Sequence, residues 1–257
     1  MNQINVAMLK GNLTHDPYFD IIPGSNTEVM KFYLAVDLPP GLALSYLLGN
    51  VVQPPFFNRF GEENRPFMRL SLAVERPLFR RQKGRHVDFL DAVAYDDAAL
   101  FAYPYLQPGS RILVCGNLRS RKYQGNTLVE LVAGTDDFTF LSKIRWQEGD
   151  AERERLLSER EQHEQVSGDN EEKSRDQYGG GFFRVVAYGN LARTCYPYLQ
   201  VGSKVFVRGE LQSRKIEDKK TGGMKTVFEI VAQEITFLRN IAWQEGDRAQ
   251  VIQEASA

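Results

Sequence analysis

Cations surround an aromatic ring in one short segment of this 257-residue chain, Glu75-Arg-Pro-Leu-Phe-Arg-Arg-Gln-Lys-Gly-Arg-His86. The cations beside Phe79 are Arg76, Arg80, Arg81, Lys83 and Arg85. Guanidinium and ammonium groups bind phosphates, and an exposed ring offers a face on which a nucleic-acid base can stack. The segment therefore predicts a basic loop that folds over a phosphate backbone. A solvated charged hairpin is the alternative.

The chain offers little for catalysis or metal binding. It contains no phosphate-cradling Gly-Lys-Ser/Thr motif, no His-Glu-x-x-His and no Cys-x-x-Cys. Its three histidines, His15, His86 and His163, are scattered among polar residues. The neighbouring acids Asp96 and Asp97 are expected to mark the end of a strand. We therefore expect no enzymatic activity, no cofactor and no metal site.

Composition places the chain among ordinary globular proteins. It is 42% hydrophobic and 25% charged, with a formal net charge of −1, so a basic surface must be local. No apolar run approaches the ~20 residues of a membrane span, and the N-terminus lacks the pattern of a signal peptide. Cys115 and Cys195 lie in apolar stretches, which favours buried thiols in a reducing compartment. These observations predict a cytoplasmic protein with no membrane partner.

The chain repeats itself in an unusual order. Residues 11–36 match residues 49–74 without a gap, and nine positions are identical. A different pair of similar segments follows, in which Phe89-Leu-Asp-Ala-Val-Ala-Tyr95 matches Phe182-Phe-Arg-Val-Val-Ala-Tyr188. Both copies of the first segment come before both copies of the second segment. A tandem duplication would instead alternate the two segments.

Nesting is the simplest explanation of this order. Residues 41–150 would form a complete unit B, inserted into a unit A made of 1–40 and 179–240. The alternative, an interlaced arrangement, would leave no contiguous unit able to fold alone. Nesting requires only that the termini of unit B lie close together, as domain termini often do. Residues 241–257 remain as a tail.

Residues 151–178 are expected to be a charged linker between unit B and the second part of unit A. Ala151–Val166 is rich in helix formers and has almost no apolar face. Ser167–Gln177 is polar and is expected to be disordered. A solvated linker is the favoured interpretation, and a helix that binds a partner is the alternative.

Both units are expected to be mostly strands. In Phe182–Tyr188, Phe183, Val185 and Ala187 share one small apolar face, while Phe182, Arg184, Val186 and Tyr188 share the other. Lys204–Arg214, Thr226–Ala232 and Ile235–Leu238 also have strand patterns, with a bend at Gly209, and Pro197 limits the intervening helix. This order fits the OB-fold, a five-stranded, partly open Greek-key barrel.

Several motifs in this order resemble those of the bacterial single-stranded DNA-binding protein family. In unit A they are Gly11-Asn-Leu-Thr-His-Asp-Pro17, Phe183-Arg-Val-Val-Ala-Tyr-Gly-Asn-Leu-Ala192, Tyr198-Leu-Gln-Val-Gly-Ser-Lys-Val205 and Arg208-Gly-Glu-Leu-Gln-Ser-Arg-Lys215. Unit B matches more loosely. The resemblance implies an all-β protein of two OB-fold barrels, with B inserted in the loop between strands 2 and 3 of A.

The resemblance also assigns functional positions. The family loop that embraces DNA corresponds to the basic segment around Phe79. Matching third-strand positions carry rings that stack on bases and an arginine that meets phosphate: Phe182, Arg184 and Tyr188 in A, and Phe89 and Tyr95 in B. Unit B departs from this pattern, because Asp91 stands where A has Arg184, and Asp96 and Asp97 follow. Burial of these rings at an interface is the alternative.

The hairpins between strands 4 and 5 supply further cations and one ring: Arg121, Lys122 and Tyr123 in B, and Arg214 and Lys215 in A. Lys219, Lys220 and Lys225 lie nearby. Unit A carries Ile216 where the family commonly has an aromatic residue. Unit A has twelve basic and nine acidic residues, and unit B has fourteen basic and twelve acidic residues, so both barrels are mildly basic.

The resemblance predicts a non-enzymatic protein that coats and protects single-stranded DNA, independently of sequence, during replication, recombination or repair. It further predicts a homodimer presenting four OB folds and a location with the nucleoid. An OB-fold adaptor that binds nucleic acid weakly is the alternative. The chain ends Ile252-Gln-Glu-Ala-Ser-Ala257 and lacks the acidic, Phe-terminated tip with which many relatives recruit partners. Trp146 and Trp243 are interpreted as structural anchors, or as docking points for another subunit.

Overall fold

The computed structural model describes residues 4–36, 42–61, 64–76, 87–123, 126–164, 181–217, 222–239 and 241. These residues fall into two compact units. One is built from residues of Met1–Asn5, Ser45–Arg119 and Val129–Gly179, and the other from residues of Val6–Leu44, Ser120–Leu128 and Gly180–Ala257. Most of their strands correspond to the expected units B and A, and these names are kept below. Residues 42–44 and 120–128, which were expected in B, fall in the second unit. The nested organisation itself stays a prediction.

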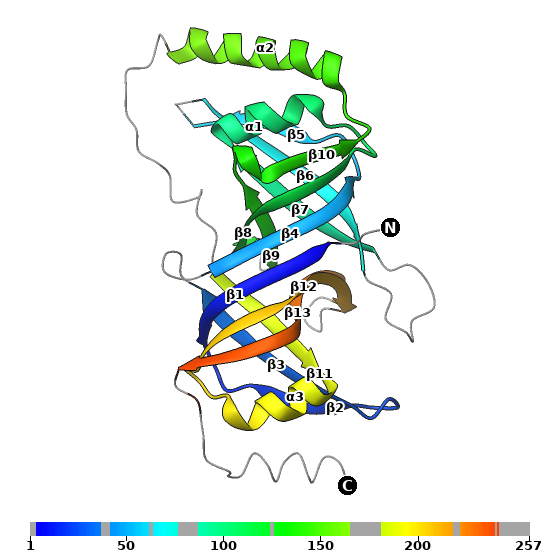
Figure 1. Ribbon diagram of the computed structural model, residues 1–257, viewed down its shortest axis with the longest axis vertical. Helices are drawn as coiled ribbons and strands as arrows, with labels where there is room; N and C mark the ends of the chain where they lie inside the picture. The colour runs from blue at the N-terminus through cyan, green and yellow to red at the C-terminus, as the bar shows by residue number, and fades with distance from the viewer. Residues whose placement is uncertain are drawn as a thin grey trace. The chain divides into compact units, whose positions relative to one another are not determined.

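Unit A combines strands from both parts of the chain. The strands are β1 (Asn5–Leu13), β2 (Tyr18–Ile22), β3 (Thr27–Val36), β11 (Gly181–Tyr188), β12 (Lys204–Glu217) and β13 (Met224–Arg239). Hydrogen-bonded neighbours run β1-β12-β13-β11-β3, and β3 pairs again with β1, which closes a five-stranded ring. In Figure 1 the blue β1 and β3 lie beside the yellow and orange β11, β12 and β13. β2 is an additional strand on β3.

Unit B closes in the same way. Its strands are β4 (Leu42–Val51), β5 (Phe56–Phe60), β6 (Arg65–Glu75), β7 (Val87–Tyr95), β8 (Arg111–Tyr123), β9 (Asn126–Ala133) and β10 (Phe138–Ser142). The ring runs β4-β6-β7-β9-β8 and returns to β4, with β5 added on β6 and β10 on β8. Two five-stranded barrels therefore occur in the chain, as the sequence pattern predicts.

Alternation along most of β11 separates the core from the outer surface, although Val186 on the outer face is also buried. Phe183, Val185 and Ala187 are buried in the barrel. Phe182 is 63% exposed and Tyr188 is 40% exposed. Successive side chains of a strand point to opposite faces, so the apolar stripe enters the core and the two rings are left outside. The expected division of this strand is confirmed.

A glycine permits the close strand packing of each barrel. A Cβ on Gly209 would lie 2.2 Å from the carbonyl oxygen of Val231, and a Cβ on Gly116 would lie 2.2 Å from that of Val132. The β12–β13 register shifts at Gly209, where the sequence predicts a bend. The two strands expected over Thr226–Ala232 and Ile235–Leu238 are one strand, β13, because the extra residue Gln233 is accommodated opposite the Arg208–Gly209 step of β12 and pairing resumes beyond it.

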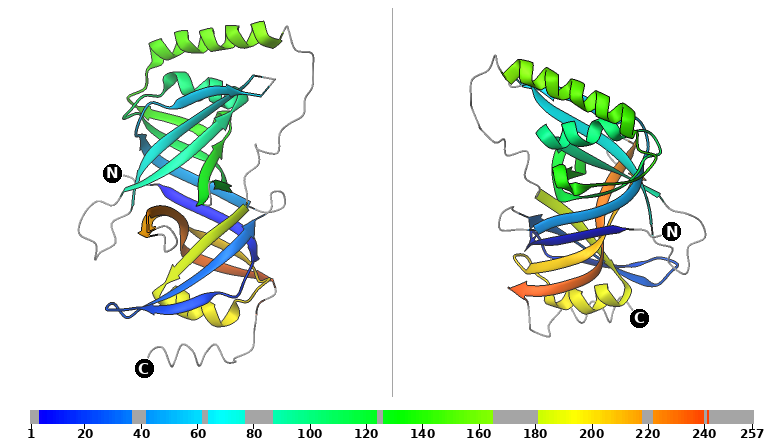
Figure 2. Two further views of the ribbon diagram at one scale, coloured as in Figure 1. Left: turned by 180° about the vertical axis from the view of Figure 1, so that it is seen from behind. Right: turned by 45° about the horizontal axis from the view of Figure 1, so that its top comes forward.

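Short helices follow β7 and β11. These are α1 (Asp96–Ala102) with the 3₁₀ turn η1 (Tyr103–Tyr105), and α3 (Gly189–Cys195) with η4 (Tyr196–Tyr198). A further 3₁₀ turn, η2 (Thr135–Asp137), joins β9 to β10. Both views in Figure 2 show α3 against its own barrel, where it contacts β3, β11 and β13. The short helix expected before Pro197 is confirmed.

The charged helix differs from the expected linker. α2 spans Trp146–Glu164, so it begins before residue 151 and includes the first Trp-Gln-Glu-Gly-Asp segment. Leu156 is buried, and the Arg59 side chain donates a hydrogen bond of 3.1 Å to its carbonyl. The ring of Trp146 lies 5.5 Å from that of Tyr105. This part of the helix therefore packs on unit B, although few of its residues are apolar.

The helices of the described residues include none with the length and apolar character needed to cross a membrane.

Candidate nucleic-acid interface

Four exposed rings lie on the outer face of unit A. Strand pairing sets Lys31 opposite Tyr18 and Tyr33 opposite Arg184, so these residues share one face of β2, β3 and β11. Directly paired residues on neighbouring strands lie close enough to interact, so rings and cations interleave here. The exposed rings of this face are Tyr18, Tyr33, Phe182 and Tyr188.

Local contacts hold the β2 end of this face. Lys31 Nζ lies 5.5 Å from the centre of the Tyr18 ring. The Tyr18 hydroxyl donates a 2.9 Å hydrogen bond to the Asp20 carboxylate. This bond lowers the pKa of Asp20 and raises the pKa of Tyr18, because it stabilises the carboxylate and the neutral phenol. The ring of Tyr18 is thereby oriented while remaining exposed.

Two arginines of unit A share one carboxylate. Arg184 Nε lies 3.6 Å from Glu229 Oε2, and Arg214 Nε lies 3.0 Å from Glu229 Oε1. Glu229 is buried, whereas Arg214 is partly exposed. Both arginines were expected to meet phosphate, and the fold brings them together from β11 and β12 beside Glu229 of β13. Glu229 and the two arginines together carry one positive charge. The buried carboxylate of Glu210, two residues before Gln212 on β12, accepts hydrogen bonds from Gln212 and Gln233.

The outer face of unit B is also aromatic. Phe56 and Phe60 on β5 and Phe89 on β7 are exposed. Phe67 lies half-buried between the rings of Phe60 and Tyr95, with ring centres 5.2 Å apart in each pair. Phe67 is paired with Tyr95 across β6 and β7. Part of this aromatic surface is therefore engaged by neighbouring rings, which leaves Phe56, Phe60 and Phe89 as its exposed members.

Carboxylates neutralise arginines on this face of unit B. Asp91, which was expected to repel phosphate, lies 2.6 Å from an Arg69 nitrogen and accepts a hydrogen bond from Ser71.

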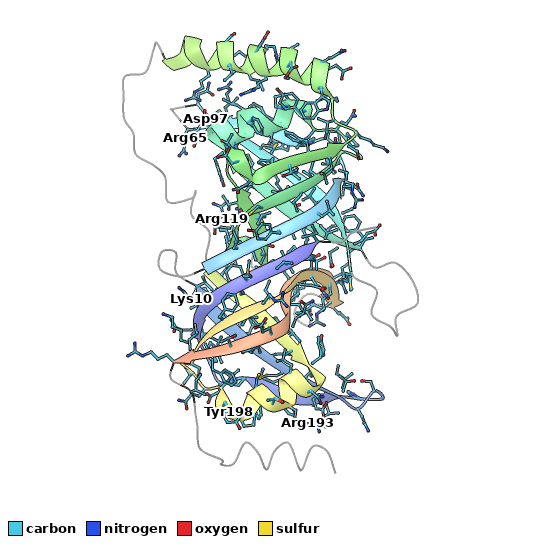
Figure 3. All side chains as sticks on the ribbon, viewed as in Figure 1. Lys10, Arg65, Asp97, Arg119, Arg193 and Tyr198 are labelled. Atoms are coloured by element: carbon cyan, nitrogen blue, oxygen red, sulfur yellow. The ribbon has the colours of Figure 1, made fainter. Side chains whose placement is uncertain are left out.

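Asp96 and Asp97 are paired as well. Asp96 accepts two hydrogen bonds from Arg65, and Asp97 pairs with Arg160 of α2. Figure 3 labels Arg65 and Asp97 at the same end of this barrel. The acids therefore balance local arginines, and the expected repulsion is reduced together with the positive charge.

Unit B uses a buried glutamate in a different way from unit A. Arg119 Nε donates a 3.0 Å hydrogen bond to Glu130, and the same guanidinium donates a 2.6 Å bond to the Tyr95 hydroxyl. Glu130 is fully buried, and the Arg119 side chain is only 12% exposed. Tyr95, a predicted stacking residue, is therefore tied to an internal ion pair.

The basic segment of unit B is described only at its start. Arg76 donates two 2.7 Å hydrogen bonds to Asp88, whose side chain is fully buried. This bidentate pair joins the end of β6 to the start of β7, so Arg76 anchors the base of the segment. The remaining predicted residues of the segment lie outside the described residues: Phe79, Arg80, Arg81, Lys83 and Arg85.

The hairpin cations lie on exposed strand ends. Arg121 and Lys122 are exposed near the end of β8, and Lys215 is exposed on β12. Tyr123 closes β8, but its side chain lies outside the described residues, as do Lys219, Lys220 and Trp243. Lys225 is on β13.

The sequence interpretation did not identify the rings and cations that β2, β3, β5 and β6 add to the candidate interface. It omitted rings and cations that alternate with buried residues on these strands, and it did not anticipate the ion-pair partner of Arg184 and Arg214. The match of residues 11–36 to residues 49–74 could have found part of this set, because it aligns Tyr18 with Phe56 and Lys31 with Arg69. The missed residues are Tyr18, Lys31, Tyr33, Phe56, Phe60, Phe67, Arg65, Arg69 and Glu229.

The cysteines are packed rather than poised for reaction. Cys195 is buried in α3, and burial raises the pKa of its thiol to about 11. Cys115, which was also expected to be buried, is only half-buried, and this partial burial raises the pKa of its thiol. Among the residues that the structure describes, no three His, Cys, Asp or Glu side chains gather in a way that could hold a metal ion.

Comparison with known proteins decides the family. The profile of the single-strand binding protein family matches residues 45–134 and again residues 161–238, which together make up more than half of the chain. The chain belongs to the single-strand binding protein family. The two matches also agree with the presence of two similar barrels.

One curated relative of this family member is single-stranded DNA-binding protein 1 of Chlorobaculum tepidum. It is 44% identical over 55 residues, which are 21% of this chain and about a third of the relative. A crystal structure of the wild-type single-stranded DNA-binding protein of Thermus aquaticus is similar in fold. That match has a TM-score of 0.51 and 14% identity, and covers 79% of this chain and 96% of the other.

Proposed function

We propose that this protein binds single-stranded DNA through the outer faces of its two barrels, independently of base sequence. Bases stack on exposed rings, and arginine and lysine side chains contact phosphates. The observation that carries the proposal is the row of exposed rings on unit A, interleaved with Lys31 and Arg184. An aromatic surface of this kind suits a flexible strand whose bases are free to stack.

The predicted DNA-binding residues contribute to this proposal in different ways. Phe182, Tyr188 and Phe89 supply exposed stacking faces, whereas Arg184 and Arg214 supply the charge of unit A. Arg121, Lys122, Tyr123 and Lys215 extend the surface along the hairpins. The segment containing Phe79 is proposed to close over the bound strand, with Arg76 and Asp88 fixing its base.

Membership of the family supports a non-enzymatic role. We propose that the protein coats and protects single-stranded DNA in replication, recombination or repair, in the nucleoid-associated cytoplasm. We also propose a homodimer, because two chains would present four barrels. Light scattering coupled to size exclusion tests this assembly, and a plain monomer at micromolar concentration would contradict it.

A protein-binding adaptor is the second candidate function, and one observation on unit B favours it. Arg65, Arg69 and Arg119 are each held by a carboxylate, so little positive charge remains beside the exposed Phe56, Phe60 and Phe89. Such a face suits an apolar protein surface better than a phosphate backbone.

The direct test is a fluorescence-anisotropy titration of the full chain against labelled oligo-dT at several salt concentrations. Binding should weaken as salt rises, because contacts with phosphates release counterions. Duplex DNA should compete poorly, because its bases are already stacked, and an RNA competitor measures the preference between the two backbones. Absence of binding at low salt would contradict the proposed function.

The basic segment discriminates the two candidates. Replacing Arg80, Arg81, Lys83 and Arg85 together by Ala should weaken oligo-dT binding and reduce its salt dependence. A protein that acts only as an adaptor should show little change. Lys143, an exposed residue of unit B outside the proposed face, provides a control substitution to Ala.

A further inference from the structure

The carboxylate of Glu229 is shared unequally between two arginines. Its Oε1 lies 3.0 Å from Arg214 Nε, whereas its Oε2 is 3.6 Å from Arg184 Nε and accepts no hydrogen bond within the described part of the chain. Glu229 is only 4% exposed. Burying a single carboxylate without a partner is costly, so the two guanidinium groups hold it in place and are held by it.

The strands fix this arrangement. Val185 pairs with Ile230 across β11 and β13, so the residues before them, Arg184 and Glu229, are neighbours. Gln212 pairs with Glu229 across β12 and β13, which brings Arg214, two residues along β12, within reach. Arg184 also lies opposite the exposed Tyr33 on β3. The pair of arginines is therefore adjacent to a proposed stacking ring.

Unit B has no arginine at the position that matches Arg184, where Asp91 stands instead. Asp91 pairs with Glu130 across β7 and β9, where unit A has Arg184 near Glu229. Glu130 forms an ion pair with Arg119, and Asp91 forms one with Arg69. These two ion pairs are neutral, whereas the three charged groups of unit A carry one surplus positive charge.

We propose that Glu229 is a positioning residue that sets the phosphate capacity of the Arg184–Arg214 pair. It holds the two guanidinium groups on the face of unit A and cancels one of their charges, so the pair takes up one phosphate of a bound single strand. This inference rests on the proposed function and names a residue that controls it. The neutral Arg69–Asp91 and Arg119–Glu130 pairs of unit B take up none.

The salt dependence of binding measures this capacity. Each phosphate neutralised on a single strand contributes about −0.7 to the slope of log affinity against log salt. Over a tenfold range of salt, that contribution is about a fivefold change in affinity. A residue that acts only through folding would alter the amount of active protein and leave the slope unchanged.

The decisive comparison uses oligo-dT, the wild-type chain and two variants. Arg184→Gln leaves Glu229 facing Arg214 alone, a neutral pair, and should make the slope shallower by about 0.7. Adding Glu229→Gln to it leaves Arg214 with its charge free for phosphate and should restore the wild-type slope. Removal of a buried carboxylate would then compensate for the removal of an arginine in binding to phosphate.

The single variant Glu229→Gln provides a further test. It leaves both guanidinium groups without a counter-charge, so its slope should be steeper than that of the wild type by about 0.7. Circular dichroism establishes whether it folds. If this variant does not fold, the double variant still tests the proposal, because Arg184 is absent and Arg214 is partly exposed.

A matched control comes from unit B. Arg119→Gln combined with Glu130→Gln removes a neutral pair, and the slope should not change. A double variant of unit A with the same slope as Arg184→Gln would overturn the inference. If the wild-type chain itself does not bind oligo-dT, the proposed function fails instead, so the two failures are distinguishable.

Discussion

The outer faces of the two barrels have similar rings but different charge. In unit A, Tyr18, Tyr33 and Phe182 are exposed beside cations that outnumber their carboxylate partner at Glu229. In unit B, Phe56 and Phe89 are equally exposed, but Arg69 is neutralised by Asp91. The two copies have thus kept the aromatic surface and diverged in the charge beside it.

This difference separates two contributions to strand binding. Stacking needs only an exposed ring and tolerates any base, whereas phosphate contacts depend on the net charge of the face. We therefore expect unit A to provide most of the salt-sensitive part of the affinity. Unit B is expected to contribute stacking that depends little on salt.

The largest effect is expected from truncation, which tests whether each part of the chain folds on its own. A fragment of residues 41–164 should unfold cooperatively, because it contains all strands of unit B and helix α2. Residues 179–257 alone should not fold, because they lack β1 and β3, which complete the ring of unit A. Circular dichroism with denaturant titration measures both, and cooperative folding of 179–257 would contradict the nested organisation.

Removing one ring from each face compares their stacking. Phe182→Ala should weaken oligo-dT binding by ~1–3 kcal/mol, the usual contribution of one stacked base. Phe89→Ala, at the matching position of unit B, should weaken it less, because the neighbouring Asp91 stands where unit A has Arg184. Anisotropy at one fixed salt concentration checks this order, and equal effects of the two variants would contradict the predicted dominance of unit A.

Neutralising an acid should make unit B more like unit A. Asp91→Asn releases Arg69 from its ion pair, so affinity for oligo-dT at low salt should rise and the salt slope should steepen by about 0.7. The control is Asp150→Asn. It removes one negative charge from α2, where Asp150 accepts a hydrogen bond from the Tyr105 hydroxyl. An equal effect of both variants would show that total charge, rather than the charge of this face, governs binding.

The smallest effect concerns the cores beneath the two faces. Cys195 of unit A has a thiol pKa of about 11, raised from 9.0 by burial, and unit B has the buried Ala102 at the matching position. Because the folded state favours the neutral thiol, its contribution to stability is complete below pH 9.0 and is lost as the pH rises through about 11.

Cys195→Ala should remove this dependence on pH. Denaturant unfolding of the wild type and the variant across that interval measures it, and the free energy of unfolding should fall with pH more steeply in the wild type. Parallel pH profiles for the two proteins would mean that the thiol is not protected from ionisation by the fold.

Much of the fold follows from local sequence. The alternation in Phe182–Tyr188 separates Phe183 from Phe182 because side chains of a strand alternate between faces, whatever the strand packs against. The repeats likewise indicate two similar barrels, and Pro197 limits α3 wherever the helix lies. The continuation of β13 and the start of α2 at Trp146 escaped prediction, because pairing register and packing decide where an element ends.

The amino-acid sequence by itself determined which rings and cations this protein can present, because their types and spacing are local properties. Only the tertiary structure decided which of these cations are paired with a carboxylate. Glu229 meets Arg184 and Arg214 because three strands become neighbours, and Asp91 meets Arg69 because β6 pairs with β7. An ion pair depends on the distance between residues remote in the chain, and that distance is set by the closure of each barrel.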